Sequence, residues 1–242
     1  MKRISFILAA LLLSLAAAQE PTTFDFETEA GTLRVTPLGH ASVLLELGDT
    51  VIHIDPYSEV ADYSAQPDAD WVWVTHEHGD HLDLAAIEEI ATEETQYLMD
   101  ERTAEAAGLE DVTLIANGDT LELDGLTVVA LPAYNVVRER DNGQKYHPEG
   151  WYNGFILEIG DFRMHFGGDT ECIPEFADVG PLNVSFLPIN LPYTMPPEEA
   201  AACYRTLNPE IAIPYHQGEF DPQIVADLLA DTDIEVRVLE LP

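Results

Sequence analysis

Basic residues are scarce in this chain. Ten lysines and arginines stand against 45 aspartates and glutamates, which gives a formal net charge of −35. Lys145 is the only lysine beyond residue 2. Because phosphate groups are bound by Lys and Arg that displace counterions, this composition argues against nucleic acid and anionic membranes as partners. Surplus charge of one sign repels itself and is screened by salt, so the acidity fits either a saline habitat or an ordinary acidic secreted protein.

Cysteine is almost absent as well. The two cysteines, Cys172 and Cys203, are too few for a disulfide framework in a chain of 242 residues. They could form one disulfide in an exported protein, but we favour buried free thiols, since free cysteine is commonly buried. The sequence also has no Gly-x-Ser-x-Gly segment, which argues against a serine nucleophile. Gly167-Gly168 lacks the Lys-Ser/Thr pair of a phosphate-binding loop.

Long apolar runs are confined to the N-terminus. Residues 1–3 supply a short positive start, residues 4–17 are almost wholly apolar, and residues 16–18 are three alanines that suit a cleavage site. This order is typical of a secretory signal peptide, and the run is short for a membrane span. We therefore expect residues 1–18 to be a signal peptide and residues 19–242 to form one exported domain, periplasmic or extracellular, without stable membrane insertion after cleavage. An uncleaved membrane anchor is the alternative.

Short β-rich runs alternate with turns and helical segments through the rest of the chain. Gly-Asp or Asp-Gly pairs at 48–49, 124–125 and 160–161 each separate two apolar runs and predict three hairpins. Apolar spacing predicts helices after residues 83, 196 and 221. Hairpins followed by β–α alternation in both halves favour an α/β fold in which two sheets pack together with helices outside. Residues 19–30 are expected to form a loose leader.

One run carries most of the chemistry. His76-Glu77-His78-Gly79-Asp80-His81 follows directly after the apolar segment 71–74. Imidazole and carboxylate together suit zinc and its first-row neighbours. Alternate side chains of extended backbone share one direction, so His76 and His78 can face the same way while Asp80 and His81 come round the turn. This pattern favours two adjacent metals over one closed cage. A surface cluster without function is the alternative, but solvated faces are built from Lys and Glu.

Residues 75–83, THEHGDHLD, resemble the signature of the metallo-β-lactamase superfamily. Further motifs follow in that family's order, namely Gly39-His40, Ile54-Asp55-Pro56, Gly167-Gly168-Asp169-Thr170 and Pro214-Tyr215-His216. The resemblance spans residues 33–217 and is nearest to the branch that contains the ascorbate-phosphate lactonase and related phosphodiesterases. It implies a four-layered αβ/βα sandwich of two mixed β-sheets flanked by helices, with the site at the sheet edges.

The resemblance also implies a set of metal ligands. It gives His76 and His78 to a first metal, Asp80, His81 and His216 to a second, and Asp169 to a position between them. Most of the superfamily carries a further histidine where this chain has Asn135, a poor zinc ligand. A subset pairs such an asparagine with a later His-Pro, so we expect His147 to complete the first site, with loop surface or substrate contact as alternatives. If His147 does not bind, the first metal is weak.

Several residues are expected to act around the ligands. Asp55 is predicted to accept a hydrogen bond from a ligand histidine and fix its tautomer, and Asn135 is placed with it in this supporting role. His40 is left open between the rim of the site and a backbone contact, and His53 and His165 are predicted to be structural. Three loop aromatics could line a substrate pocket, although core packing is the commoner fate of each: Tyr134, Trp151 and Tyr193.

The predicted function is that of an exported metal-dependent hydrolase with a small-molecule substrate. Two divalent metal ions would lower the pKa of a shared water, so that a metal-bound hydroxide attacks the substrate, and Asp80 is the candidate catalytic residue for the leaving group. Zinc is the first expectation, with manganese and iron as alternatives. A lactone or other ester comes first, a phosphodiester of small nucleotides or phospholipid head groups second, and a β-lactam after these. An inactive metal-binding relative is the alternative outside enzymes.

Overall fold

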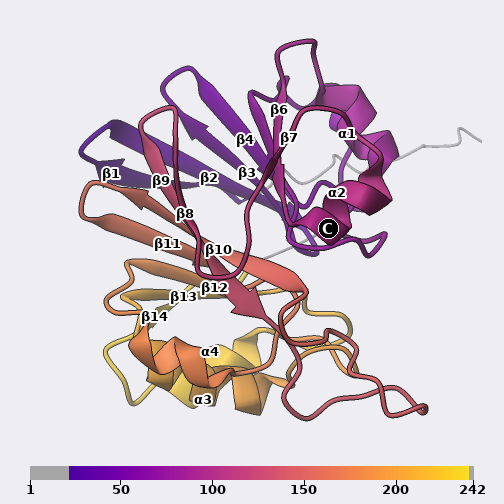
Figure 1. Ribbon diagram of the computed structural model, residues 1–242. Coiled ribbons are helices and arrows are strands. Elements are labelled where there is room, and N and C mark those ends of the chain that lie inside the picture. Colours follow the sequence, from indigo (N-terminus) through magenta and orange to yellow (C-terminus); the bar gives the residue numbers. More distant parts are fainter. Residues whose placement is uncertain (1–21, 240–242) are drawn as a thin grey trace, which may run out of the picture.

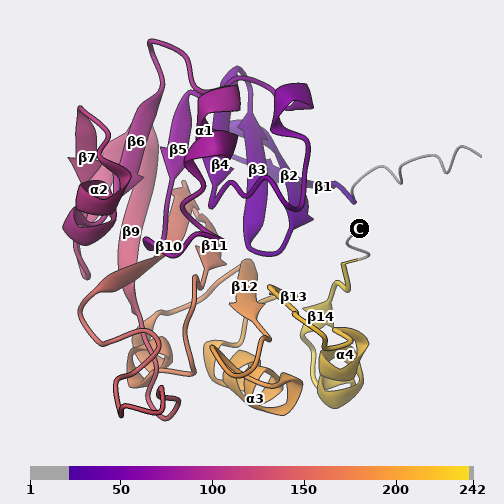
Figure 2. The same cartoon turned by 90° about the vertical axis from the view of Figure 1, so that its right-hand side faces the viewer.

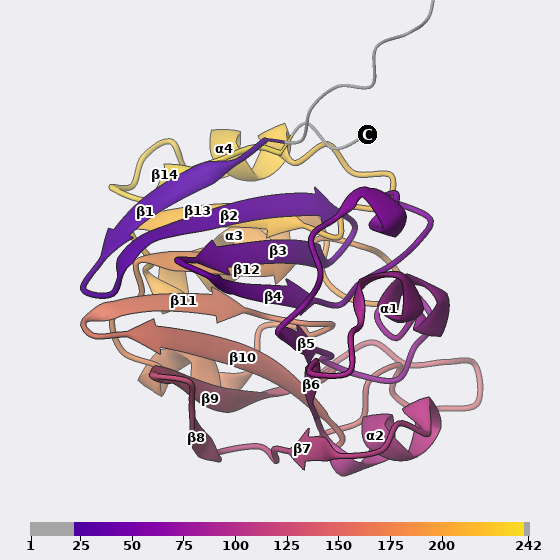
Figure 3. The same ribbon diagram turned by 90° about the horizontal axis from the view of Figure 1, so that it is seen from above.

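The computed structural model describes residues 22–239, so the predicted signal peptide lies outside the described residues. Two seven-stranded sheets face one another, and helices cover the outer face of each (Figure 1). Viewed from above, the two sheets overlie one another (Figure 3). This arrangement confirms the predicted α/β sandwich of two mixed sheets flanked by helices.

Sheet A comes from the first half of the chain, in the order β1-β2-β3-β4-β5-β6-β7. Its strands are β1 (Phe24–Thr28), β2 (Gly31–Gly39), β3 (Ser42–Leu47), β4 (Thr50–Ile54), β5 (Trp71–Trp73), β6 (Gln96–Met99) and β7 (Val112–Leu114). The first four strands are antiparallel neighbours, and from β4 to β7 the pairing is parallel. Helices α1 (Leu84–Ile90) and α2 (Glu101–Ala107) and the short 3₁₀ helix η1 (Tyr63–Ala65) complete this half.

Sheet B comes from the second half, in the order β14-β13-β12-β11-β10-β9-β8. Its strands are β8 (Thr120–Leu123), β9 (Leu126–Ala133), β10 (Tyr152–Ile159), β11 (Phe162–Phe166), β12 (Val184–Pro188), β13 (Ile211–Tyr215) and β14 (Glu235–Val236). Strands β8 to β11 are antiparallel neighbours, and β11 to β14 are parallel. Helices α3 (Pro197–Leu207) and α4 (Gln223–Leu229) lie beneath this sheet in Figure 2, and η2 (Pro174–Asp178) precedes β12.

The core has three layers. The middle layer lies between the sheets, and the other two lie between each sheet and its helices. Strand β5 shows why the sequence requires this: Trp71 and Trp73 enter the middle layer, whereas Val72 and Val74 pack toward α1. Successive strand residues face opposite sides, so a strand that is apolar throughout must be covered on both faces. The loop that follows β5 therefore starts from a rigid support.

Two sequence-based expectations were wrong. Residues 24–28 form strand β1, paired with β2, where a loose leader was predicted; the ring of Phe26 is buried in the middle layer, and its packing stabilises the strand. Cys172 and Cys203 form a disulfide, with Cα atoms 5.4 Å apart, where free thiols were favoured. The bond joins the loop after β11 to α3, and chain spacing alone did not reveal that these segments meet.

The carboxyl ends of the parallel strands of both sheets meet at one edge of the sandwich. There the N–H of Asn153, at the start of β10, donates to the carbonyl of Thr75 after β5, at 3.2 Å. Gly168, after β11, has φ +61, and a Cβ there would lie 3.1 Å from the Asn153 carbonyl oxygen and 3.2 Å from the Thr75 Cβ. Glycine is required at this point because the two sheets approach so closely. Within residues 22–239, the structure contains no helix with the length and apolar character of a membrane span.

Candidate metal centre

The loop after β5, residues 74–83, is fixed at both ends by aspartates. At its start, Asp55 Oδ1 accepts the N–H of Thr75 at 2.7 Å. At its end, Asp83 accepts the N–H groups of Ala85 and Ala86 and so caps α1. Between them the N–H of His81 donates to the His78 carbonyl at 2.9 Å, which closes a tight turn. One contact from the end of β4 and two contacts within or next to the loop therefore position the predicted signature.

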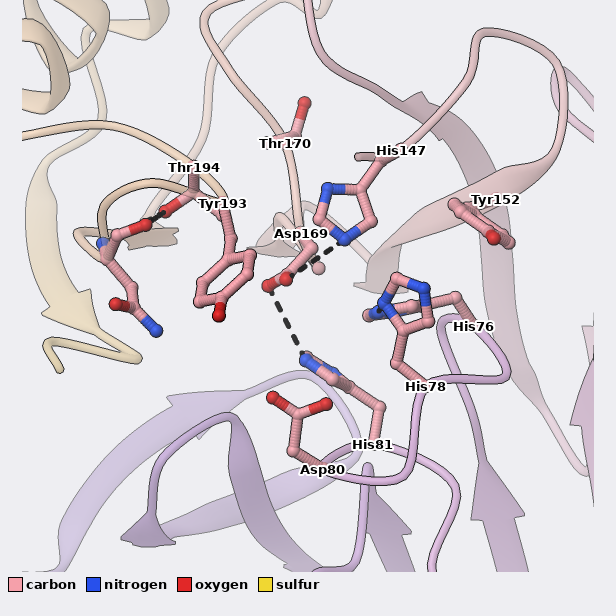
Figure 4. Close-up of polar contacts among 12 residues, drawn as sticks. His76, His78, Asp80, His81, His147, Tyr152, Asp169, Thr170, Tyr193 and Thr194 are labelled. Atoms are coloured by element: carbon pink, nitrogen blue, oxygen red, sulfur yellow. Dashed lines mark hydrogen bonds and ion pairs between the residues drawn. The ribbon is translucent and has the colours of Figure 1, made fainter. Parts of the chain in front are cut away.

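The structure brings all seven predicted metal ligands together. Potential ligand atoms lie within 4.8 Å of one another in three groups: His76, His78 and His147; His40, Asp80, His81 and His216; and His76, His81 and Asp169. The signature loop supplies four of these residues. Of the other predicted ligands, His147 lies in the loop between β9 and β10, Asp169 in the loop after β11 and His216 at the end of β13, and Figure 4 shows His147 and Asp169 beside the signature loop. The second group also contains His40, which follows β2. The first two groups share no residue, and the third connects them.

Asp169 lies at the centre of the cluster and is 4% exposed. Its Oδ1 is 3.2 Å from His216 Nε2 and 3.4 Å from His81 Nε2, whereas its Oδ2 is 3.2 Å from His147 Nε2. The two carboxylate oxygens thus face different groups of histidines, as Figure 4 shows for His147 and His81. This is the position that the resemblance implied for Asp169.

Unpartnered polar atoms gather at the same point. His81 Nε2, His147 Nε2, His216 Nε2 and Asp169 Oδ1 are buried and have no hydrogen-bond partner among the described residues. A buried polar atom without a partner costs on the order of 1–3 kcal/mol, so four at one point call for a ligand. Imidazole nitrogens and carboxylate oxygens are the donors that zinc and related cations take. The residues present therefore fit a divalent metal site.

His40, which the sequence left open, belongs to this cluster. Its Nε2 is 2.9 Å from Asp80 Oδ2, and its ring lies over that of His216 with centroids 3.6 Å apart. Its carbonyl accepts the N–H of His216 at 2.9 Å. The Gly39-His40 pair was the sequence signal for this residue, and the contact with Asp80 shows why the pair belongs to the motif set.

The backbone is strained at three points of the site. His40, Asp55 and His216 have φ values of 51°, 46° and 47°, and they are three of the six non-glycine residues in the described part of the chain with positive φ. This left-handed conformation costs about 1–2 kcal/mol for a residue with a side chain. Each of the three directly follows a strand, β2, β4 or β13, and turns its side chain into the cluster. Such strain persists where the surroundings fix the residue, and it is concentrated at functional sites.

Asp55 and Asn135 contact ligand histidines on the side away from the centre. Asp55 Oδ2 lies 2.8 Å from His81 Nδ1 and also accepts the Thr75 hydroxyl at 2.7 Å. Asn135 Oδ1 accepts the His147 N–H at 2.7 Å and lies 2.9 Å from His147 Nδ1. In both pairs an oxygen faces Nδ1, which places the ring proton there and leaves Nε2 free toward the centre.

Burial and charge shift the pKa values of the central groups in opposite directions. Burial acts to raise the pKa of Asp169, but the charges of His216, His81 and His147 outweigh it and hold that pKa well below its usual range. Burial acts to lower the pKa of His81, yet the carboxylates of Asp169 and Asp55 hold it well above its usual value. Burial lowers the pKa of His76 well below its usual value. Without a cation, Asp169 is therefore ionised and His76 is neutral, whereas His81 favours its protonated form. A cation bound here would take the place of that proton on His81.

Of the three aromatic residues predicted to line a substrate pocket, one is buried and two are exposed. Tyr134 does not line the site: it is 7% exposed, packs between sheet B and its helices, and donates its hydroxyl to Glu175 at 3.0 Å. Tyr134, directly after β9, thus has the core packing that the sequence analysis gave as its commoner fate. Trp151, by contrast, lines a cavity of about 420 Å³ with Arg102, whose guanidinium lies 3.7 Å over its ring. Tyr193 is 45% exposed and lies beside the cluster in Figure 4.

Other histidines and aromatics have structural contacts. His53 Nε2 lies 3.1 Å from the Pro67 carbonyl and His165 Nδ1 lies 3.0 Å from the Ser185 hydroxyl, outside the three ligand groups, as predicted. Burial lowers their pKa values to about 4 and about 3. Tyr152 donates its hydroxyl to Glu77 at 2.9 Å and its ring lies 5.1 Å from that of His76.

Sequence reasoning missed two polar residues that support the site. Glu171 is 3% exposed, and its carboxylate accepts the N–H groups of the three residues after Asn135 as well as the Asn135 side-chain amide. Asn190 places its side-chain amide 3.1 Å from His216 Nδ1. Glu171 could have been noticed as the acid that follows the Gly-Gly-Asp-Thr motif. Asn190 belongs to no motif, and only the fold brings it to His216.

Similarity to known proteins agrees with this geometry. A family model described as "Beta-lactamase superfamily domain" matches residues 34–216. A UPF0173 metal-dependent hydrolase of Methanopyrus kandleri is 31% identical over 209 residues, 78% of this chain and 86% of the relative. A UPF0173 metal-dependent hydrolase of Deinococcus radiodurans is also 31% identical, over 234 residues, 86% of this chain and 96% of the relative.

Solved structures show the same relationship. The crystal structure of a candidate metal-dependent hydrolase from Parabacteroides distasonis is 38% identical, covers 92% of this chain and 100% of its own, and has a TM-score of 0.86. Igni18, a metallo hydrolase from Ignicoccus hospitalis, is 22% identical with a TM-score of 0.71 over 86% of this chain and 95% of its own, a likeness of fold. The protein thus belongs to the metallo-β-lactamase superfamily, among chains similar to the UPF0173 metal-dependent hydrolases.

Proposed function

We propose that this protein is a metal-dependent hydrolase that holds two divalent cations between its sheets. His76, His78 and His147 would hold one cation, Asp80, His81 and His216 the other, and Asp169 would contact both. The observation that carries the proposal is the set of buried, unpartnered Nε2 atoms that face the two oxygens of Asp169. The names of the UPF0173 relatives, metal-dependent hydrolases, support the same class of reaction.

When bound, cations at this site supply an activated water as nucleophile and Lewis acids for negative charge that develops on the substrate. The chain's own residues keep the donors in place. Asp55 and Asn135 hold the ring protons of His81 and His147 on Nδ1. The Asp80 side chain is 38% exposed, against 4% for Asp169, so it is the carboxylate of the cluster nearest to solvent. We therefore assign Asp80 both to a cation and to the side from which the leaving group departs, with His40 holding its Oδ2.

An ester or lactone is the substrate class that we favour over a phosphodiester. Recognition of phosphate relies on Arg and Lys, and among the described residues the ion pairs of Asp80 and Asp169 are all with histidines. The chain's charge of −35 also repels polyanions. The fold does not decide between reactions: an isothiocyanate hydrolase from Delia radicum gut bacteria (16% identical, TM-score 0.60) has a similar fold. The choice rests on charge and on the resemblance to the lactonase branch.

We further propose that the protein works outside the cytoplasm with zinc. The signal-peptide pattern of residues 1–18 supports export, and so does the Cys172–Cys203 disulfide, since disulfides persist in oxidising compartments. Zinc is favoured because imidazole nitrogens predominate among the donors. Metal analysis of the protein recovered from its native compartment distinguishes zinc from manganese and iron.

The test begins with purified mature protein. Metal content is measured, the protein is stripped with chelator, and it is reconstituted separately with zinc, manganese or iron before assay on a chromogenic ester, a lactone, bis-nitrophenyl phosphate and a β-lactam. We expect about two cations per chain, ester or lactone turnover that is lost on stripping and restored by metal, and loss of turnover in His78→Ala. His53→Asn, outside the ligand groups, is the matched control and should keep its metal content. Bound cations without turnover of any of these substrates would contradict the hydrolase proposal.

A further inference from the structure

The turn of residues 190–194 directly follows β12 and lies beside the cluster. Figure 4 shows Tyr193 of this turn near Asp169, with Thr194 on the far side of Tyr193. Two groups of the turn are linked to histidines of the two proposed cation sites. One is the side-chain amide of Asn190, and the other is the backbone carbonyl of Tyr193.

The first link runs to the site that contains His216. The Asn190 amide lies 3.1 Å from His216 Nδ1, and the other ring nitrogen, Nε2, lies 3.2 Å from Asp169 Oδ1. Gly218 leaves room for this amide: it has φ +53, and a Cβ there would lie 2.5 Å from Asn190 Oδ1. Any larger residue at 218 would push the amide away from His216.

The second link runs to the site that contains His147. The carbonyl oxygen of Tyr193 accepts the side-chain N–H of Asn135 at 2.8 Å. Asn135 Oδ1 in turn accepts the His147 N–H at 2.7 Å and lies 2.9 Å from His147 Nδ1. The orientation of His147 therefore depends, through one asparagine, on where the Tyr193 carbonyl lies.

Thr194 fixes the two ends of the turn relative to one another. It is fully buried, and its hydroxyl oxygen accepts the Asn190 N–H at 2.9 Å and donates to the Asn190 carbonyl at 3.1 Å. The N–H groups of Tyr193 and Thr194 also donate to that carbonyl, at 3.1 and 2.8 Å. A movement of either end is thereby passed to the other.

We propose that Asn190 and Thr194 are positioning residues that set a histidine of each cation site through this one turn. The inference rests on the proposed function in that the two sites bind cations. A ligand histidine needs an acceptor for the proton on its other ring nitrogen, and loss of such a partner typically costs 10- to 100-fold in metal affinity. For His147 the acceptor is Asn135 Oδ1. For His216 the structure places the Asn190 amide at Nδ1 with its nitrogen nearest, and the acceptor is Asn190 Oδ1 once the amide is turned end for end, since the two ends are nearly the same in shape.

The experiment measures zinc affinity of the full mature chain by competition with a chromogenic chelator. We expect Asn190→Ala to weaken one cation by roughly 10- to 100-fold and Asn190→Asp, which keeps an acceptor oxygen, to retain most of the affinity. Thr194→Val removes the hydroxyl at nearly constant volume and should weaken both cations, while Thr194→Ser restores them. Cobalt-loaded samples add a spectrum that reports the ligand geometry without any assay of turnover.

Two variants are matched controls. Asn183→Ala removes an asparagine at the opposite end of the β12 segment, where it bonds to Arg163 and Glu210. Thr103→Val removes a buried hydroxyl on α2, outside the ligand groups. Both should bind zinc as the wild type does. If Asn190→Ala and Thr194→Val fold and also bind both cations with wild-type affinity, the inference is overturned; if Thr194→Val weakens one cation alone, the shared role of the turn is overturned.

The outcome separates this inference from the proposed function. A wild type that binds two cations but hydrolyses nothing contradicts the hydrolase proposal, while the affinities of the variants still decide the role of the turn. If the wild type binds no cation, nitrogen-15 spectra of the histidine rings decide it. In the wild type the His147 proton should reside on Nδ1, and Thr194→Val should give a mixture of the two tautomers; an unchanged spectrum would count against the inference.

Discussion

The two halves of the metal centre are built in different ways. The signature loop of residues 74–83 contributes four candidate ligands within six residues and is held at two points, by Asp55 at its start and by Asp83 at its end. Sheet B contributes only one candidate ligand from each of three loops, and two of these ligands have their own support, since Asn135 holds His147 and Asn190 holds His216. The contrast shows that one loop held at two points can place four ligands, whereas scattered ligands need a separate buried polar contact for each position.

The largest effect should come from the residue that both halves share. We expect Asp169→Asn to reduce zinc content from about two cations toward none and to lower kcat/KM by roughly 10³-fold or more, because its carboxylate would contact both cations. Asp80→Asn, confined to one group, should release one cation and retain the other. Elemental analysis after dialysis and assay on a chromogenic ester measure both. Retention of two cations in Asp169→Asn would remove Asp169 from its central role.

The second largest effect should come from Asp55, which holds the signature loop. Asp55→Asn keeps the volume but replaces the charged oxygen that faces His81 Nδ1, and we expect zinc to bind about 10- to 100-fold more weakly. The effect should be confined to the cation that His81 holds. Chelator competition measures it, and Asp70→Asn, an aspartate on the same sheet that bonds to the Val51 N–H, is the control. Equal weakening of both cations would contradict the independence of the two halves.

Much of this division could be anticipated from the sequence. The spacing of residues 76–81 indicates a metal site without any structure, and alternating hairpins indicate two sheets. The resemblance placed Asp169 and His216, and the structure puts both beside His81. The contacts of Asn190 and Glu171 could not be predicted, since they join segments that meet only in the folded chain. Core packing was the commoner expectation for Tyr134 and is what the structure has, but the sequence gave no indication of which face of the sheet its ring would meet.

The disulfide joins two segments that both belong to the sheet B half. Cys172 lies three residues after Asp169 and ties its loop to α3 across a sequence separation of 31 residues. We expect the double variant Cys172→Ser/Cys203→Ser to lower the free energy of unfolding of the metal-free protein by about 4 kcal/mol, chiefly by enlarging the entropy of the unfolded chain. Urea denaturation with and without reductant measures it. If reductant lowers the double variant as much as the wild type, the disulfide is not the cause.

Each sheet also buries one histidine beneath its half of the site, His53 in sheet A and His165 in sheet B. Their folded pKa values, about 4 and about 3, lie below the ordinary 6.5 because burial disfavours the charged ring. Between pH 6.5 and 4 the unfolded chain therefore binds protons that the folded chain does not, and stability should fall as the pH is lowered. Each histidine contributes a slope of up to about 1.4 kcal/mol per pH unit.

His53→Asn and His165→Asn should each flatten that dependence, which urea denaturation of the metal-free protein at pH 6.5, 5.5 and 4.5 measures. The double variant compares the two sheets directly. Its pH dependence of the free energy of unfolding should fall by the sum of the two single reductions, because the histidines lie in different sheets. A slope unchanged by both substitutions would assign the acid sensitivity to other groups.

Salt concentration should have the smallest effect on the free energy of unfolding, and it should act equally on both halves of the molecule. A chain with a formal charge of −35 repels itself on both halves alike, and raising ionic strength from about 0.1 M to about 1 M shortens the screening length from roughly 10 Å to 3 Å. We expect the free energy of unfolding of the metal-free protein to rise with sodium chloride, in the wild type and in the disulfide-free variant by the same amount, because the repulsion is spread over the whole surface. Potassium chloride should act like sodium chloride if screening is the cause. Full stability in dilute buffer would instead identify an ordinary acidic protein. A salt effect seen only in the disulfide-free variant would show that the repulsion acts within the sheet B half.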